Sequence, residues 1–189
     1  MFIQAAAPTR DRLEKYSELQ QEGVRLAAEI NERHGDGDYR PVELIVRHHS
    51  PDEVYELFRA ADACIVSSLH DGMNLVAKEY IASKNNQDGV LVLSEMAGSA
   101  KELGEAIIVN PYDTSAMANA LERALLMPQQ EQKDRMLLMR ELIRDRNVYR
   151  WAAQMLMDAS RLRKRERIRS KRRARALDAA GVEPIRRRA

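Results

Sequence analysis

Two carboxylates eight residues apart form the most distinctive chemical pattern of the sequence. Asp71 stands in the tight turn His70-Asp71-Gly72, directly after an apolar run, and Glu79 lies in the helical pattern that begins near Asn74. This spacing corresponds to about two helical turns, or roughly 12 Å of rise. One carboxylate could then meet sugar hydroxyls while the other meets a ribose. Spacing alone favours a simpler interpretation, in which Asp71 caps the helix and Glu79 lies on a solvated face.

The strands that would position these residues are visible as short apolar runs rich in β-branched residues. They are expected at residues 2–6, 42–46, 64–68, 89–93 and 106–110. Because the runs lack polar alternation, helices should cover both faces of a parallel sheet. With right-handed crossovers, this predicts an α/β fold with a doubly wound parallel sheet. The sheet is Rossmann-like, although the sequence has no Gly-x-Gly-x-x-Gly fingerprint.

Helical patterns fill the spaces between these runs and continue after them. They are expected at residues 10–33, 51–61, 74–83, 99–103, 114–127, 129–145 and 148–176. The segment Ser50-Pro51-Asp52-Glu53 is a capping box with proline at the first helical position. The sequence therefore predicts a Rossmann-like domain over residues 1–127, C-terminal helices packed on it over 128–160, and a basic helical or disordered tail over 161–189.

The loops that follow the strands are the expected binding region. Ligands of open parallel sheets bind beyond the carboxyl ends of the strands, here residues 8–10, 48–50, 69–74, 95–99 and 110–113. The helix start near Asn74 would offer free backbone amides to a phosphate group. Gly98 and Ser99 begin a short helix in the same binding region, and their amides are further candidates to bind a phosphate group. His48 and His70 are more simply interpreted as packing or turn residues.

Composition separates an acidic body from a basic tail. Residues 161–189 contain 13 Lys and Arg against 3 Asp and Glu, although the whole chain has a net charge of only +2. The tail has the charge to bind nucleic acid, but it lacks aromatic residues for base stacking, so a solvated helical extension is favoured. The single cysteine, Cys64, is interpreted as a buried thiol. With no signal peptide and no membrane span, the expected location is the cytoplasm.

The segment Asp71-Gly72-Met73-Asn74-Leu75-Val76-Ala77-Lys78-Glu79-Tyr80 resembles the signature of the trehalose-6-phosphate synthase family. The flanking segments AAAPTR, YELFRAADACIVSSLHDGMN, GVLVLSEMAGSAKEL, AIIVNPYD and NVYRW agree with the same family. Its members are retaining glycosyltransferases with two Rossmann-like domains, the GT-B type. The resemblance runs in order from residue 2 to residue 156 and implies that the chain is the C-terminal, donor-binding part of such an enzyme.

The resemblance also implies specific roles for individual residues. Asp71 would be the catalytic-site carboxylate that holds hydroxyls of the transferred glucose, and His49 would contact the uracil. Arg10 would reach the phosphate of the acceptor, for which a guanidinium is well suited. The remaining donor-binding residues would be Leu75, Val76, Ala77, Lys78 and Glu79, with the first two amides near the diphosphate and Glu79 on the ribose.

The implied reaction is glucosyl transfer from UDP-glucose to glucose 6-phosphate, without a cofactor or a metal. Glucosylglycerol-phosphate synthase, which uses ADP-glucose and glycerol 3-phosphate, shares much of the signature and stays an alternative. The family's acceptor domain, and the first strand and helix of its donor domain, would lie outside this chain and be supplied in cis or in trans. We therefore expect negligible turnover from the chain alone. A non-catalytic module that binds nucleic acid or a partner through the tail is the second alternative.

Overall fold

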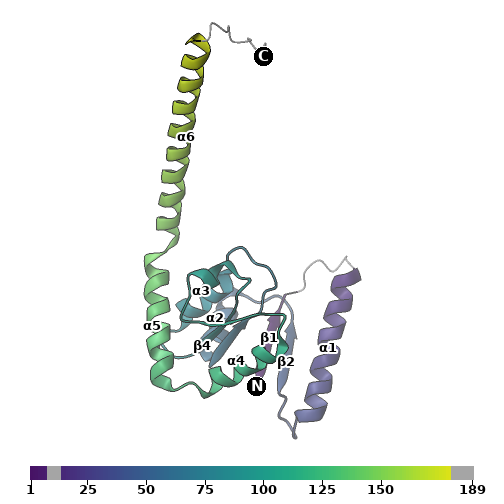
Figure 1. Cartoon of the computed structure of the whole chain (residues 1–189). Coiled ribbons are helices and arrows are strands. Elements are labelled where there is room, and N and C mark those ends of the chain that lie inside the picture. Colours follow the sequence, from purple (N-terminus) through teal and green to yellow (C-terminus); the bar gives the residue numbers. More distant parts are fainter. Residues whose placement is uncertain (8–13, 180–189) are drawn as a thin grey trace.

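The computed structural model describes residues 1–7 and 14–179, and it consists of parallel strands, flanking helices and one long terminal helix (Figure 1). The strands are β1 (Phe2–Ala6), β2 (Val42–Val46), β3 (Ala63–Val66), β4 (Val90–Ser94) and β5 (Ile107–Val109). The helices are α1 (Glu14–His34), α2 (Pro51–Ala60), α3 (Leu75–Ser83), the 3₁₀ helix η1 (Gly98–Lys101), α4 (Thr114–Leu126), α5 (Gln129–Asp145) and α6 (Val148–Ala179).

Strand β4 is the centre of the fold, because all five of its residues are buried. It pairs in parallel with β3 on one side and β5 on the other. One apolar cluster joins Leu91 and Leu93 to Tyr80 and Ile81 of α3 and Met136 of α5. A second cluster joins the opposite face of the sheet to α4. Helices thus cover both faces of these strands, as the uniformly apolar sequence predicts.

The five strands do not form one continuous ladder. Strands β1 and β2 make a parallel pair in the register Phe2↔Val42 to Ala6↔Val46. Strands β3, β4 and β5 make a separate parallel sheet in the order β3-β4-β5. The fold class predicted from the sequence is confirmed, while the division of the sheet into two ladders is a feature that the hydrophobic pattern did not contain.

The helix boundaries follow local capping signals. Helix α2 begins with the predicted capping box, in which the amide of Glu53 donates to Ser50 Oγ and the amide of Ser50 donates to the Glu53 carboxylate. Helix α5 occupies the predicted residues 129–145. The short helix predicted over 99–103 is the 3₁₀ helix η1, which starts one residue earlier.

The two C-terminal helices behave differently. Helix α5 packs on α3 and contributes Met136 and Met139 to the core. Helix α6 leaves the body and extends away from it (Figure 1). Its apolar residues Trp151 and Met155 are 55% and 51% exposed, in contrast to the buried methionines of α5. The predicted domain boundaries themselves stay a prediction. Within the described residues, no helix is both apolar and long enough to cross a membrane.

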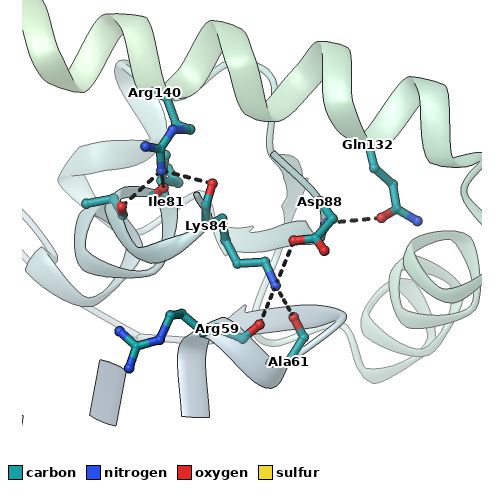
Figure 2. A network of polar contacts seen from close by, with 9 residues as sticks. Arg59, Ala61, Ile81, Lys84, Asp88, Gln132 and Arg140 are labelled. Carbon is teal, nitrogen blue, oxygen red and sulfur yellow. Dashed lines mark hydrogen bonds and ion pairs between the residues drawn. The ribbon is translucent and has the colours of Figure 1, made fainter. Parts of the chain in front are cut away.

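A buried lysine connects α2, α3 and the turn before β4 (Figure 2). The side chain of Lys84 is 3% exposed. Its Nζ donates to the carbonyl oxygens of Arg59 (3.1 Å) and Ala61 (2.8 Å) and pairs with Asp88 Oδ1 (3.1 Å). These three oxygens compensate the loss of hydration that burial of an ammonium group imposes.

An arginine from α5 completes the same region (Figure 2). Arg140 Nη1 donates to the carbonyl oxygens of Ile81, Ala82 and Lys84, at 2.8, 2.9 and 2.9 Å. These carbonyls belong to the C-terminal end of α3, where the helix leaves acceptors unpaired and where positive charge is favourable. The two cations therefore fix the end of α3 that lies away from the loops after the strands.

The lysine network predicts a large stability difference between two lysine substitutions. Lys84→Met removes the buried donor and leaves its carbonyl and carboxylate partners unpaired, which should lower the free energy of unfolding by about 2–4 kcal/mol. Lys101→Met, at an exposed lysine of η1, should change it by less than about 0.5 kcal/mol. Urea unfolding followed by circular dichroism measures both. A loss below about 1 kcal/mol for Lys84→Met would contradict the assigned role.

Candidate functional site

The loop after β3 is joined to the loop after β4 by backbone hydrogen bonds. The amide of Asp71 donates to Met96 O (3.3 Å), the amide of Gly98 donates to Asp71 O (2.8 Å), and the amide of Ser99 donates to Met73 O (2.8 Å). A parallel bridge between Asp71 and Ala97 continues the pairing of the two strands beyond their ends. The two loops therefore act as one rigid rim at the carboxyl end of the sheet.

Asp71 fixes the first turn of this rim through its side chain. Its Oδ1 accepts from the amides of Met73 (3.1 Å) and Asn74 (2.9 Å), and its Oδ2 accepts from Asn74 Nδ2 (3.1 Å). These donors, led by the Met73 amide, hold the pKa of Asp71 below its usual range. A carboxylate has about four lone-pair positions, so acceptor capacity stays open for a hydroxyl from a ligand.

Asn74 closes the start of α3. It has φ 67°, a left-handed backbone conformation that asparagine tolerates better than most residues. Its side chain is buried, donates to Ser68 Oγ (3.2 Å) and accepts from the Ala77 amide (2.9 Å). Among the described residues, no acceptor bonds the amides of Leu75 and Val76. The helix thus begins with two free donors on an exposed turn.

The predicted donor-binding residues differ in how accessible they are. Leu75 and Val76 are 58% and 45% exposed, and their amides have no acceptor among the described residues. Ala77 is fully buried and its amide is already bonded to Asn74, so neither its side chain nor its amide is open to a ligand. Lys78 Nζ pairs with Glu102 Oε2 at 2.9 Å, and the carboxylate of Glu79 is half-buried without a hydrogen-bond partner among the described residues.

One further predicted residue, His49, lies in the loop that follows the other strand pair. His49 follows β2, is half-buried, and has a buried Nδ1 without a partner in the described part of the chain. Its Nε2 lies 3.5 Å from Ile45 O. Arg10 lies outside the described residues, so its predicted role stays a prediction. His48 and His70 are exposed.

The expectation that Gly98 and Ser99 offer amides to a ligand is wrong. Both amides are bonded to the carbonyl oxygens of the Asp71–Met73 turn. The contribution of these residues is instead steric and structural, because a Cβ at Gly98 would collide with the carbonyl oxygen of Gly72. The buried Ser99 Oγ has no partner among the described residues.

Sequence reasoning also missed Ser68 and Ser94, which stabilise the joined loops at the ends of β3 and β4. Ser94 Oγ donates to Ser68 O (2.7 Å) and accepts from the Met96 amide (3.1 Å). Serines at the ends of two apolar strands were the available signal. Cys64, in contrast, is half-buried, and burial raises its pKa to about 12, which removes it as a nucleophile.

The close approach of the two loops predicts unequal effects of two glycine substitutions. Gly98→Ala should displace the Gly72 carbonyl, loosen the turn, and cost about 1–3 kcal/mol of unfolding free energy. Gly104→Ala, where a Cβ meets no atom within 4 Å, should be nearly neutral. Thermal unfolding of both variants measures this difference. Equal melting temperatures would show that the loops are not in contact in solution.

The lowered pKa of Asp71 predicts a pH-dependent contribution to stability. The folded pKa lies below the unfolded value of about 3.9, so the unfolded chain holds the proton more tightly. The stabilising contribution is therefore present above pH ~4 and lost as the pH falls through the folded pKa. The stability difference between wild type and Asp71→Asn should stay constant from pH ~7 to ~5 and shrink below pH ~4. Urea unfolding of both proteins at each pH measures this stability difference. A difference that persisted at low pH would contradict a stabilising role of the ionised Asp71 carboxylate.

Comparison with known proteins gives a consistent result. The sequence model of glycosyltransferase family 20 matches residues 1–161. The trehalose-6-phosphate synthase of Enterobacter sp. is 38% identical over 161 residues, which cover 85% of this chain and 34% of that protein. The glucosylglycerol-phosphate synthase of Synechocystis sp. is 41% identical over 158 residues, which cover 84% of this chain and 32% of that protein.

The structural comparison agrees with the sequence comparison. The solved structure of a UDP-forming α,α-trehalose-phosphate synthase from Burkholderia xenovorans, in complex with glucose-6-phosphate, matches with a TM-score of 0.80 and 40% identity. The match covers 83% of this chain and 35% of that one, so the chain spans about a third of the length of these relatives. The family match, the identities and the shared fold lead to one conclusion: the chain belongs to glycosyltransferase family 20.

Proposed function

We propose that the chain is the donor-binding part of a trehalose-6-phosphate synthase and that it binds UDP-glucose at the start of α3. The observation that carries the proposal is the pair of free, exposed amides of Leu75 and Val76, which lie between two carboxylates, Asp71 and Glu79. Free amides at a helix N-terminus attract phosphate, and the helix dipole adds to this attraction.

The chemistry of the donor fits the order of these groups along the helix. The diphosphate would accept hydrogen bonds from the Leu75 and Val76 amides. Asp71, which retains acceptor capacity at its carboxylate, would hold hydroxyls of the glucose. Glu79, whose half-buried carboxylate has no partner among the described residues, would accept hydrogen bonds from the ribose hydroxyls. His49 Nδ1, buried and unpaired in the described part, is suited to a polar atom of the base.

The corresponding reaction is glucosyl transfer to glucose 6-phosphate with retention at the anomeric carbon, as in trehalose biosynthesis. The leaving phosphate accumulates negative charge as UDP departs, and donors placed beforehand stabilise it best. Two amides supply part of this stabilisation. The acceptor would be bound by Arg10 together with the rest of the family fold, which this chain does not span. Turnover by this chain alone should therefore be negligible. We assign the reaction to the cytoplasm.

Glucosylglycerol-phosphate synthesis from ADP-glucose and glycerol 3-phosphate is the second candidate. The observation that favours it is the 41% identity to the Synechocystis sp. glucosylglycerol-phosphate synthase, which is as high as the identity to the trehalose enzymes. Competition among UDP, ADP and GDP for the chain separates the candidates. Preference for UDP supports the first, and preference for ADP supports the second.

The donor site is tested by a substitution at the proposed ribose-binding residue. Glu79→Ala should weaken UDP binding by tenfold or more, on the order of a lost charge-assisted hydrogen bond pair, while circular dichroism stays unchanged. Glu122→Ala, at an exposed position of α4, is the matched control and should bind as wild type does. Isothermal titration calorimetry with UDP and UDP-glucose measures both variants. If Glu79→Ala bound UDP as tightly as wild type, the ribose assignment would be wrong.

A further inference from the structure

The helix that begins the proposed donor site, α3, is held by few packing contacts along its first residues. Of residues 75–79, only Ala77 is fully buried, and an alanine side chain offers little packing that could resist rotation of the helix. The large buried side chains of α3, Tyr80 and Ile81, follow later in the helix. The orientation of the helix start therefore depends on polar contacts.

One of these contacts is an ion pair at the fourth residue of the helix. Lys78 Nζ lies 2.9 Å from Glu102 Oε2, and the two side chains are 22% and 34% exposed. No other acceptor bonds this ammonium group within the described part of the chain. Lys78 is thus engaged by the protein itself, at the distance of a charge-assisted hydrogen bond.

Glu102 lies on a rigid part of the fold. Its amide donates to Ser99 O (3.0 Å), and the next residue, Leu103, is 1% exposed in the same apolar cluster as the buried residues of α3. Its second carboxylate oxygen, Oε1, lies 3.9 Å from Arg146 Nη1 at the end of α5. One carboxylate thus connects α3, the segment after η1 and the end of α5.

The segment that carries Glu102 also holds the turn before α3. The amide of Ser99 donates to Met73 O (2.8 Å). Helix α3 is therefore attached to this segment at two points, through Met73 before its first residue and through Lys78 within the helix. Because the Lys78 side chain lies off the helix axis, the second point fixes the rotation of the helix as well as its position.

The rotation of α3 matters because the proposed donor ligands lie close to Lys78 on the helix surface. Leu75 lies three residues before Lys78 and four before Glu79, so it is a neighbour of both. A rotation of about 20° would move each Cα by roughly 0.8 Å, for a helix radius of about 2.3 Å. A binding site is held within about 0.5 Å of its productive geometry. Loss of the second attachment would therefore be enough to misplace the amides.

We propose that Glu102 is a positioning residue of the donor site, and that Lys78 acts through Glu102 and not as a ligand of the donor. The ion pair fixes the rotation of α3. It thereby fixes the directions of the Leu75 and Val76 amides and of the Glu79 carboxylate. This role rests on the proposed donor site and adds to it a residue that binds no ligand. It also replaces the donor-binding role of Lys78 that the family resemblance implies.

The first test is UDP binding by Glu102→Gln, measured by calorimetry on the full 189-residue chain. The substitution keeps the size of the side chain and removes its charge. UDP binding should weaken about fivefold or more, on the order of one weakened hydrogen bond to a charged group. The urea midpoint should stay near that of wild type, because partly exposed ion pairs contribute little to stability. If Lys78 were a ligand of the diphosphate, its release from Glu102 would instead strengthen UDP binding, and the proposal would be wrong.

A second carboxylate of the chain provides a matched control. Glu131 Oε1, in the first turn of α5, lies 2.8 Å from Arg135 Nη2 and 3.9 Å from Arg123 Nη2. It thus has two cations at nearly the same distances as Glu102 has. Glu131→Gln should bind UDP as wild type does. An equal loss of affinity in both variants would show that the effect is not specific to Glu102 and would contradict the proposal.

A double-mutant cycle tests whether Lys78 acts through Glu102. Lys78→Met should weaken UDP binding by the same factor as Glu102→Gln, and the double variant should lose no more than either single variant. Lys78→Arg, which keeps a cation within reach of Glu102, should bind UDP as wild type does. Additive losses in the double variant would show two independent roles and would overturn the proposal.

Nuclear magnetic resonance of the unliganded chain keeps this test separate from that of the donor site. Relaxation of the Leu75 and Val76 amide nitrogens is measured in wild type, Glu102→Gln and Glu131→Gln. The order parameters of both amides should fall in Glu102→Gln, from about 0.85 toward about 0.6, and stay unchanged in Glu131→Gln. Unchanged order parameters in Glu102→Gln would contradict the positioning role whether or not UDP binds. If wild type failed to bind UDP while the order parameters fell as expected, the donor site would be wrong and the hold of Glu102 on the helix start would stand.

Discussion

The exchange of hydrogen bonds between the Asp71–Met73 turn and the Met96–Ser99 segment is the interaction on which the binding region depends. It joins the loops after β3 and β4 into one rim and fixes where α3 begins. The Asp71 carboxylate accepts hydrogen bonds from the amides of Met73 and Asn74, and the Asn74 side chain accepts one from the amide of Ala77. Within the described part of the chain, the amides of Leu75 and Val76 have no acceptor. The position of the two donors is thus set before any ligand arrives.

This arrangement explains why residues that bind no ligand are as constrained as those proposed to bind one. Gly98 must lack a Cβ because the Gly72 carbonyl occupies that space. Asn74 must tolerate a positive φ while its buried side chain serves as donor and acceptor. Both requirements are local. Through a few hydrogen bonds, Gly98 and Asn74 fix the position of the free amides of Leu75 and Val76. Donors fixed in this way need little reorganisation when charge develops on a bound phosphate.

Sequence patterns predicted the elements better than their assembly. The apolar runs located all five strands within two residues at each end, and the capping box at Ser50 and the bounds of α5 were correct, because these signals are local. The division of the sheet into two ladders could not be predicted from these runs. All five strands are similarly apolar, so their sequences do not show which strands pair. The misassigned amides of Gly98 and Ser99 have the same origin. A sequence shows that an amide lies near the expected binding loops. Whether that amide already donates to a carbonyl oxygen depends on the fold.

The division of the strands into two ladders and the proposed donor site are two aspects of one topology. In a doubly wound sheet, the crevice for a ligand opens where the strand order reverses direction. Here the chain forms β1 and β2 as one ladder and β3, β4 and β5 as another, so the change of direction lies between the two ladders. The loop that carries Asp71 follows β3, and the loop that carries His49 follows β2. A donor held by Asp71 and His49, as proposed, would bridge the two ladders. Because linkage is reciprocal, any stabilisation that the ladders gain from the bound donor would return as donor affinity.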